Sequence, residues 1–375
     1  MEIGIVTNEI GPGSGQGRVN YEVAQAACER GHHVVLLSSE VDPQLAAARN
    51  ATWIQISAEN WPTRLLKDQV FAWRSARWLE ANASRLDVVL GNGCNTWFSP
   101  DFNAAHFVHS AWKESPVHTS QVQTGPYAWY QWLYTTVNAY WEKRAFREAG
   151  TVIAVSEQVR NELVDAGIRR DAIRVVHNGV DTSEFKPGPA ERADLGLPEN
   201  VPLALFVGEI RTPRKNLDTV LEALDSVPTL HLAVAGRRAE SPYPDMARRL
   251  GLSDRVHFLG FRKDVPDLMR AADLFVFPSR YEACSLVLLE AMASGLPIVT
   301  AQTAGGAELV EDCFGRVLPD PNDEQALAQA LDSLIGDPEQ LEDMGRAARS
   351  AATHHTWSNM ANEYLALFEQ EDSRS

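Results

Sequence analysis

The chain has 375 residues, 45% of them apolar, and a formal net charge of −16. This length predicts two domains, and the apolar fraction excludes wholesale disorder. No apolar run reaches the roughly 18 residues of a membrane span, and the strong acidity disfavours non-specific nucleic-acid binding.

The four cysteines lie far apart without a CxxC pair, which favours buried reduced thiols over disulfides or a metal site. The first residues, MEIGIV, lack a basic leader and a cleavage site, so we expect no secretion signal. Together these features predict a cytoplasmic protein, with a position at the inner face of the membrane left open.

The first half predicts a parallel α/β domain, because buried strands alternate with helices. The expected strands are 3–7, 34–37, 53–56, 88–90, 104–108, 151–155 and 174–177. A glycine loop, 11–18, separates the first strand from a helix that ends at Gly31. The backbone N–H groups of Gly15, Gln16 and Gly17 are expected to approach an anion, with a plain tight turn as the alternative. The dinucleotide fingerprint GxGxxG fails, because Arg18 takes the place of its third glycine.

Two further features of the first half are candidates for function. Residues 127–146 predict a long helix with aromatic side chains on two sides, which we interpret as core and helix packing. An acceptor-binding wall or a membrane-interface surface is the alternative. His109 follows a predicted strand, whereas His106 is expected to face the other side of that strand.

A linker is predicted at 185–200, rich in proline and glycine, and the α/β alternation then resumes. The expected strands are 203–207, 230–235, 256–259, 275–277 and 298–300, with helices at 215–226, 243–251, 264–272 and 285–294. Three closing helices are expected at 323–335, 338–352 and 357–370. The two halves therefore predict two doubly wound parallel sheets.

Several motifs occur in a defined order along the chain. They are the glycine loop, AVSE at 154–157, VHNGVD at 176–181, VGE and RKN within 207–216, the pair Glu282 and Glu290, EAMASGLP at 290–297, and AGGAE at 304–308. In this order they resemble the retaining family 4, or group 1, glycosyltransferases. The resemblance covers nearly the whole chain and is strongest from 151 to 318.

The resemblance implies the GT-B fold, in which two Rossmann-like domains face a central cleft. Residues 1–185 would bind the acceptor, 200–355 would bind a nucleotide-diphosphate sugar, and the helix in 356–375 would cross back to the first domain. It also implies transfer of a hexose, from a UDP-sugar by preference, to a hydroxyl of a glycan, glycolipid or small metabolite. Relatives are thought to react on one face of the sugar, without a metal or another cofactor.

The site residues follow from these motifs. The catalytic candidates are Glu282, His109 and Lys215. The donor-binding candidates are Gly15, Gln16, Gly17, Arg211, Arg214, Lys215, Phe261, Arg262, Cys284, Ser285, Leu286 and Glu290. No metal ligand is expected. The family's arginine after the strand-end glycine is replaced here by Glu209, which leaves open whether Arg211 or Arg214 joins Lys215 on the pyrophosphate.

The spacing of Glu282 and Glu290 gives this site a physical interpretation. Eight helical residues rise about 12 Å, which is of the order of the distance from ribose to sugar in a nucleotide sugar. The helix N-terminus at Cys284, Ser285 and Leu286 would meet the pyrophosphate between them. The alternative is two solvated surface glutamates, although a carboxylate in the apolar stretch around Glu290 is costly to bury.

Three other functions remain as alternatives. A sugar-nucleotide epimerase or hydrolase would use the same donor site. A non-catalytic nucleotide-sugar-binding subunit would bind the donor without turnover. A nucleotide-dependent oxidoreductase is disfavoured by the failed GxGxxG pattern.

Overall fold

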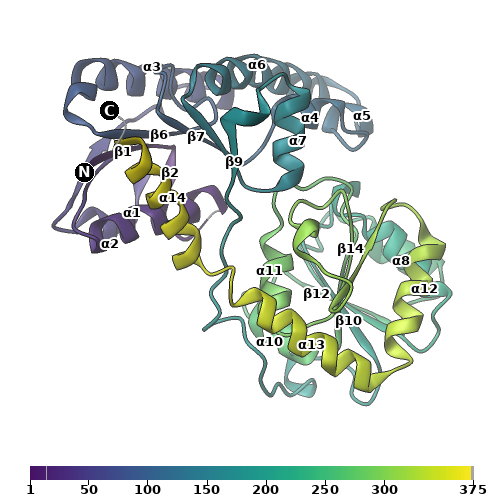
Figure 1. The fold of residues 1–375 in the computed structure, drawn as a ribbon. Coiled ribbons are helices and arrows are strands. Elements are labelled where there is room, and N and C mark those ends of the chain that lie inside the picture. Colours follow the sequence, from purple (N-terminus) through teal and green to yellow (C-terminus); the bar gives the residue numbers. More distant parts are fainter. Residues whose placement is uncertain (14, 373–375) are drawn as a thin grey trace. The chain divides into compact units, whose positions relative to one another are not determined.

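The computed structural model describes residues 1–13 and 15–372, which form two compact units (Figure 1). The first unit comprises residues 1–179 and the chain from Trp357 onward, and the second comprises Val180 to Thr356. The first border precedes the predicted linker at 185–200, in which Phe185 and Leu197 are buried in the core of the second unit.

The first unit is built on a seven-stranded parallel sheet with the order β5-β3-β1-β6-β7-β8-β9. Its strands are β1 (Glu2–Val6), β3 (His33–Ser38), β5 (Ala51–Gln55), β6 (Val88–Asn92), β7 (Phe102–Ala105), β8 (Thr151–Ala154) and β9 (Ile173–Val175), and a short parallel pair is formed by β2 (Glu9–Ile10) and β4 (Glu40–Val41). The apolar runs of the sequence lie in the central strands, where Ile3, Ile5 and Leu90 are fully buried.

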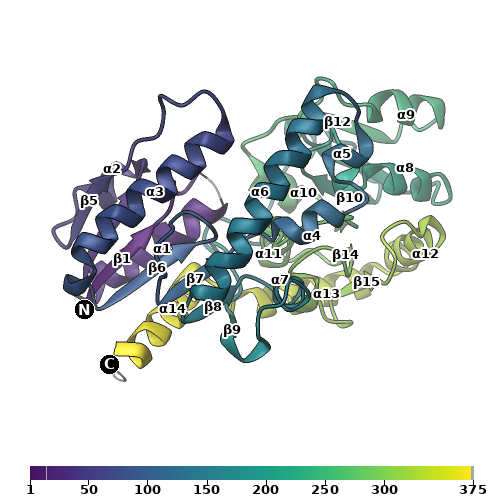
Figure 2. The same ribbon diagram turned by 90° about the horizontal axis from the view of Figure 1, so that it is seen from above.

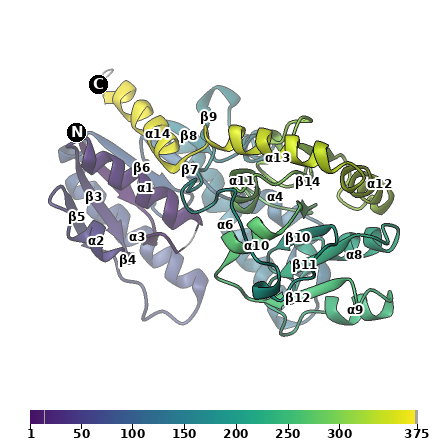
Figure 3. The same cartoon turned by 90° about the horizontal axis from the view of Figure 1, so that it is seen from below.

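Helices cover both faces of this sheet. They are α1 (Gly15–Glu29), α2 (Pro43–Ala46), α3 (Arg64–Asn82), α4 (His109–Glu114), α5 (Thr119–Val122), α6 (Pro126–Glu148), α7 (Glu157–Asp165) and α14 (Trp357–Asp372). The long helices α3 and α6 lie over one face (Figure 2), and α1 and α14 lie side by side over the other (Figure 3). Ser156 caps α7, as its type and position favour, because its Oγ accepts a hydrogen bond from the Val159 N–H at 3.1 Å.

The second unit is built on a six-stranded parallel sheet with the order β12-β11-β10-β13-β14-β15. Its strands are β10 (Leu203–Val207), β11 (His231–Ala235), β12 (Val256–Gly260), β13 (Leu274–Phe277), β14 (Ile298–Ala301) and β15 (Gly315–Leu318). Its helices are α8 (Leu217–Asp225), α9 (Tyr243–Arg249), α10 (Val265–Ala271), α11 (Leu286–Ala293), α12 (Glu324–Ile335) and α13 (Pro338–Ala352). Helices α11 and α13 pack together on one face and α8 and α12 on the other (Figure 1).

The strand order of each unit is that of a doubly wound fold, in which ligands bind outside the carboxyl ends of the strands where the order reverses. The prediction of two doubly wound parallel sheets is confirmed. The reversal falls between β1 and β6 in the first unit and between β10 and β13 in the second.

The aromatic side chains of α6 do lie on more than one side of the helix, but their interpretation as core is wrong for half of them. Phe146 is buried, whereas Tyr127, Trp129, Trp132 and Tyr140 are between 42% and 67% exposed. Within the described residues, no helix is both long enough and apolar enough to cross a membrane.

Candidate functional site

The first candidate site lies at the reversal point of the second unit. β10 ends at Val207 and is followed by the segment 208–216, and β13 ends at Phe277 and is followed by the elbow 278–285. The two loops are hydrogen-bonded to each other, since the Arg280 N–H donates to the Arg214 carbonyl at 2.9 Å. This arrangement brings Lys215, from the first loop, to Glu282, from the second.

Glu282 is held by two cations. The Lys215 ammonium pairs with its Oε1, and the Arg214 Nη1 lies 3.2 Å from the same oxygen. Both the lysine and the carboxylate are largely shielded from solvent, with side chains 13% and 11% exposed. Burial lowers the pKa of Lys215, and the charge of Glu282 offsets this only in part. Two positive charges are thus gathered at one point beside the carboxyl ends of the strands.

Arg211 lies apart from this pair. Its Nε and Nη2 donate to the two oxygens of Glu209 at 2.9 and 2.7 Å, and its backbone N–H donates to the same carboxylate. Glu209, which replaces the family's arginine, therefore forms an ion pair with Arg211. Of the two arginines left open by the sequence, Arg214 is the one beside Lys215.

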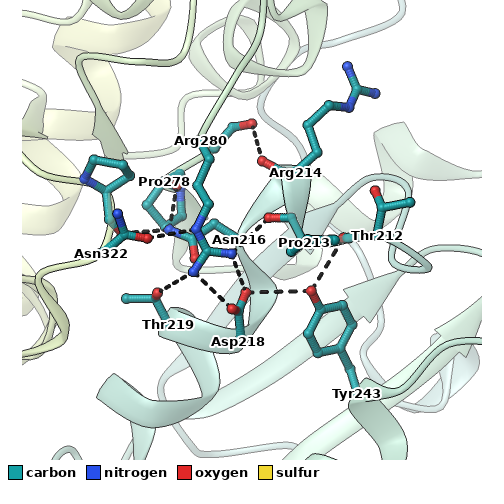
Figure 4. Close-up of polar contacts among 12 residues, drawn as sticks. Thr212, Pro213, Arg214, Asn216, Asp218, Thr219, Tyr243, Pro278, Arg280 and Asn322 are labelled. Carbon is teal, nitrogen blue, oxygen red and sulfur yellow. Dashed lines mark hydrogen bonds and ion pairs between the residues drawn. The ribbon is translucent and has the colours of Figure 1, made fainter. Parts of the chain in front are cut away.

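A partly buried network around Arg280 fixes the loop that carries these cations (Figure 4). The Arg280 guanidinium donates to both oxygens of Asp218 at 2.9 and 2.8 Å and to the Pro213 carbonyl at 2.8 Å. Its Nε donates to Asn322 Oδ1 at 2.6 Å, which adds a third segment of chain. A guanidinium with five fixed donors suits this role, and a lysine would not span it.

Asn216 gives the same loop its shape. It adopts a left-handed backbone conformation, with φ of 65°, which asparagine tolerates better than most residues. Its side chain is buried and donates to the Pro278 carbonyl at 2.9 Å. The loop is therefore pinned to the elbow after β13 from both ends of the RKN motif.

The helical spacing expected between Glu282 and Glu290 is wrong. Helix α11 begins at Leu286, and Glu282 lies before it in an isolated parallel bridge with Ala304. Only the segment from Leu286 to Glu290 is helical, a rise of about 6 Å rather than 12 Å. A partner segment holds the elbow extended, because the Ser285 N–H donates to the Gly305 carbonyl and the Gly305 N–H donates to the Glu282 carbonyl.

Gly305 makes this pairing possible. A Cβ at this position would lie 2.0 Å from the Ala283 carbonyl oxygen, so only glycine fits. The hydroxyl of Ser285, at the start of α11, is buried without a hydrogen-bond partner within the described structure. Such a group, next to the N–H groups of a helix N-terminus, suits an incoming anion.

Glu290 is partly buried on α11. Burial, followed by the charge of Glu184, raises its pKa to about 7. Hydrogen-bond donors from a ligand would stabilise the ionised form of this buried carboxyl group.

The remaining donor candidates of the second unit lie at its surface or edge. Phe261 is 69% exposed, and Arg262 donates through Nε to Asp264 at 2.7 Å. Cys284 is half-buried beside the N-terminus of α11. The roles of these three residues stay predictions.

A second polar site lies in the first unit, around His109. Its Nδ1 lies 2.7 Å from Glu142 Oε1, and its backbone N–H donates to Oε2 at 2.8 Å. Burial alone would lower the pKa of His109, but the charge of Glu142 and this hydrogen bond outweigh burial and raise it. Since Nδ1 faces Glu142, the opposite nitrogen, Nε2, is the one left for other contacts.

The expectation that His106 faces away from His109 is wrong. β7 ends at Ala105 and His109 begins α4, so the alternation of a strand does not extend across them. Both histidines line one cavity. Gln16 lines it as well and donates to Thr7 Oγ1 at 3.1 Å, from the first turn of α1. Gly15 and Gly17 belong to this same helical turn rather than to a loop.

Comparisons with known proteins agree with this arrangement. Residues 13–184 match the family model "Glycosyltransferase Family 4", and residues 188–351 match "Glycosyl transferases group 1". The chain belongs to this glycosyltransferase family. The D-inositol 3-phosphate glycosyltransferase of Nocardia farcinica is 33% identical over 244 residues, which cover 60% of this chain and 54% of that protein. The chain thus spans about half the length of this curated relative.

Solved structures of GT-B glycosyltransferases share the fold. Sucrose-phosphate synthase from Thermosynechococcus elongatus aligns over 100% of both chains with a TM-score of 0.79 and 21% identity. Anabaena Alr3699/HepE, in complex with UDP and glucose, aligns over 98% of this chain and 99% of its own with a TM-score of 0.70 and 21% identity.

Sequence reasoning missed four residues that shape the two sites of this chain. Arg280 and Asp218 support the cation loop, Glu142 orients His109, and Asp68 lies with His109 in the same cavity. One signal was visible in advance. Glu142 is an acidic residue among the aromatic side chains of α6, where a buried carboxylate needs a partner.

Proposed function

We propose that this chain transfers a sugar from a nucleotide-diphosphate sugar to a hydroxyl group with retention of the anomeric configuration. The observation that carries the proposal is the convergence of Lys215 and Arg214 on Glu282 at the reversal point of the second sheet. When the diphosphate binds, these two cations exchange the carboxylate for phosphate oxygens. Glu282 is then free to accept hydrogen bonds from the sugar hydroxyls.

The reaction needs little else from the protein. The bond between the sugar C1 and the diphosphate oxygen breaks, and C1 bonds to the acceptor oxygen on the same face. The acceptor proton passes to the leaving diphosphate, whose growing charge Lys215 and Arg214 stabilise. We propose that these cations and the N-terminus of α11 stabilise this negative charge without a metal ion. Glu290 accepts hydrogen bonds from the ribose hydroxyls.

UDP is the proposed nucleotide. Its support is the Anabaena structure with UDP and glucose, which shares the fold. In this proposal the second unit binds the donor, and the first unit, with His109, binds the acceptor. The relative's name does not identify the acceptor of this chain, because the matched part covers about half of that protein.

A thermal-shift screen of UDP-, GDP- and ADP-sugars identifies the donor, because a ligand that binds the folded state raises the Tm. The product's anomeric configuration, read by NMR, then tests retention, and activity that persists in EDTA tests metal independence. An inverted product refutes the mechanism. Breakdown of the donor at the same rate with and without acceptor favours a hydrolase instead, and binding without turnover favours a non-catalytic subunit.

A further inference from the structure

A small polar cavity lies at the reversal point of the first unit. Asn8 follows β1, Asn92 ends β6 and His106 follows β7, so the cavity is set at the carboxyl ends of three neighbouring strands. Ligands of doubly wound sheets bind at this position. The volume, about 140 Å³, is below the roughly 300 Å³ of pockets for drug-sized ligands and suits a single small ring.

The charges in this cavity are already matched in pairs. The Arg64 Nε lies 2.9 Å from Asp68 Oδ1, and the Tyr134 hydroxyl donates to Asp68 Oδ2 at 3.0 Å. His109 is paired with Glu142 in the same way. Within the described part of the chain, Arg64 is the only lysine or arginine that lines the cavity. A phosphate group needs surplus cations, and the one cation of the described lining, Arg64, is already paired with Asp68.

The same lining suits hydroxyl groups. A carboxylate oxygen accepts two hydrogen bonds, so Asp68 and Glu142 each keep acceptor capacity beyond the bonds described. Amides supply the donors, among them Asn8, Asn95 and Asn138. A hydroxyl both donates and accepts, and it can therefore bridge a carboxylate and an amide.

We propose that this cavity binds an uncharged polyhydroxyl ring, a hexose or cyclitol without phosphate, as the acceptor. The role as acceptor rests on the proposed function, whereas the preference for an uncharged ring rests on the paired charges. Asp68 is the residue that sets the preference, because it both accepts from hydroxyls and neutralises Arg64.

The test uses the full chain and saturation-transfer NMR. The probes are glucose and myo-inositol, each beside its phosphate monoester. We expect the wild-type chain to bind the neutral ring at least ten-fold more tightly than its phosphate. In Asp68→Asn, the neutral ring should bind about ten-fold more weakly and the phosphate more tightly, because Arg64 is released. Asp165→Asn, which removes an exposed carboxylate from α7, should change neither.

Opposite changes in the affinities for the neutral ring and its phosphate cannot result from loss of folding, which weakens the binding of both ligands. Equal or tighter binding of the phosphates to the wild type, no binding of either ring, or parallel shifts in Asp68→Asn would each overturn the inference. UDP binding to the same sample, measured by thermal shift, separates this inference from the proposed function. Intact UDP binding beside failed polyol binding overturns the cavity assignment alone, and polyol binding without donor turnover overturns its role as acceptor site.

Discussion

Replacing Glu290 with glutamine tests the donor half of the proposed site through its pH dependence. The pKa of Glu290 is raised to about 7, mainly by burial, whereas a glutamate in an unfolded chain titrates near about 4.3. Between these values the folded state holds a proton that the unfolded state has released. Stability therefore falls as the pH rises through this window. At about 1.4 kcal/mol per pKa unit, the full effect has an upper limit of about 4 kcal/mol, which solvent around the partly exposed side chain reduces.

Glutamine does not titrate, so Glu290→Gln removes this pH dependence. Near pH 4 we expect the variant and the wild type to have similar unfolding free energies. By pH 8 the variant should be more stable by about 1–3 kcal/mol. Donor binding should change in the opposite direction. The wild type should bind UDP-sugar more tightly as the pH rises through 7, and the variant should bind weakly at every pH.

Two spectroscopic signals can follow the unfolding of the two units separately. All ten tryptophans lie in the first unit, at positions up to Trp141 and at Trp357. Urea unfolding followed by far-UV circular dichroism reports both units, while tryptophan fluorescence reports the first alone. Glu290→Gln should shift the circular dichroism transition and leave the fluorescence transition unchanged. A stability difference that is constant from pH 4 to 8 would refute the reasoning.

Three further substitutions follow from the described contacts. Lys215→Met should lower kcat/KM about 100-fold, as loss of one preorganised charge does, while the protein stays folded; near wild-type kcat/KM would remove Lys215 from the mechanism. Arg280→Lys should destabilise the second unit by about 2 kcal/mol and lower kcat/KM for the donor about ten-fold, because the paired hydrogen bonds to Asp218 are lost. Calorimetry and kinetics check this, and unchanged values in both would show that the network is not needed. Glu142→Gln should lower the pKa of His109, so its NMR titration midpoint should move to lower pH, and an unmoved midpoint would contradict the assigned pairing.

Much of the fold could be predicted because buried parallel strands are short apolar runs. The strand 203–207 is predicted with the same bounds as β10. β15 is not predicted by the sequence, since Gly-Arg-Val-Leu contains only two apolar side chains and the strand lies at the edge of its sheet. Its position depends on β14, which no local pattern reveals.

The site was harder to predict than the fold. The types Lys215 and Glu282 stood out in the sequence, but their direct pairing arises from two loops that are 67 residues apart. The helix predicted at 285–294 agrees closely with α11, but the helical spacing was extended to Glu282, which lies in the elbow before the helix. What keeps this elbow extended is Gly305, twenty residues later. Asp68 and Arg280 gave no signal of their own, since a charged residue on a helix or loop is usually solvated.

The place of α14 in the first unit has a consequence for synthesis of the chain. Tyr364, Leu365 and Phe368 are fully buried in the core that contains β1 and α1. The first unit is therefore missing part of its interior until α14 has left the ribosome, although its segment up to Gly179 emerges before the second unit. The second unit is continuous and can be complete earlier. The unit whose synthesis begins first is thus completed after the other.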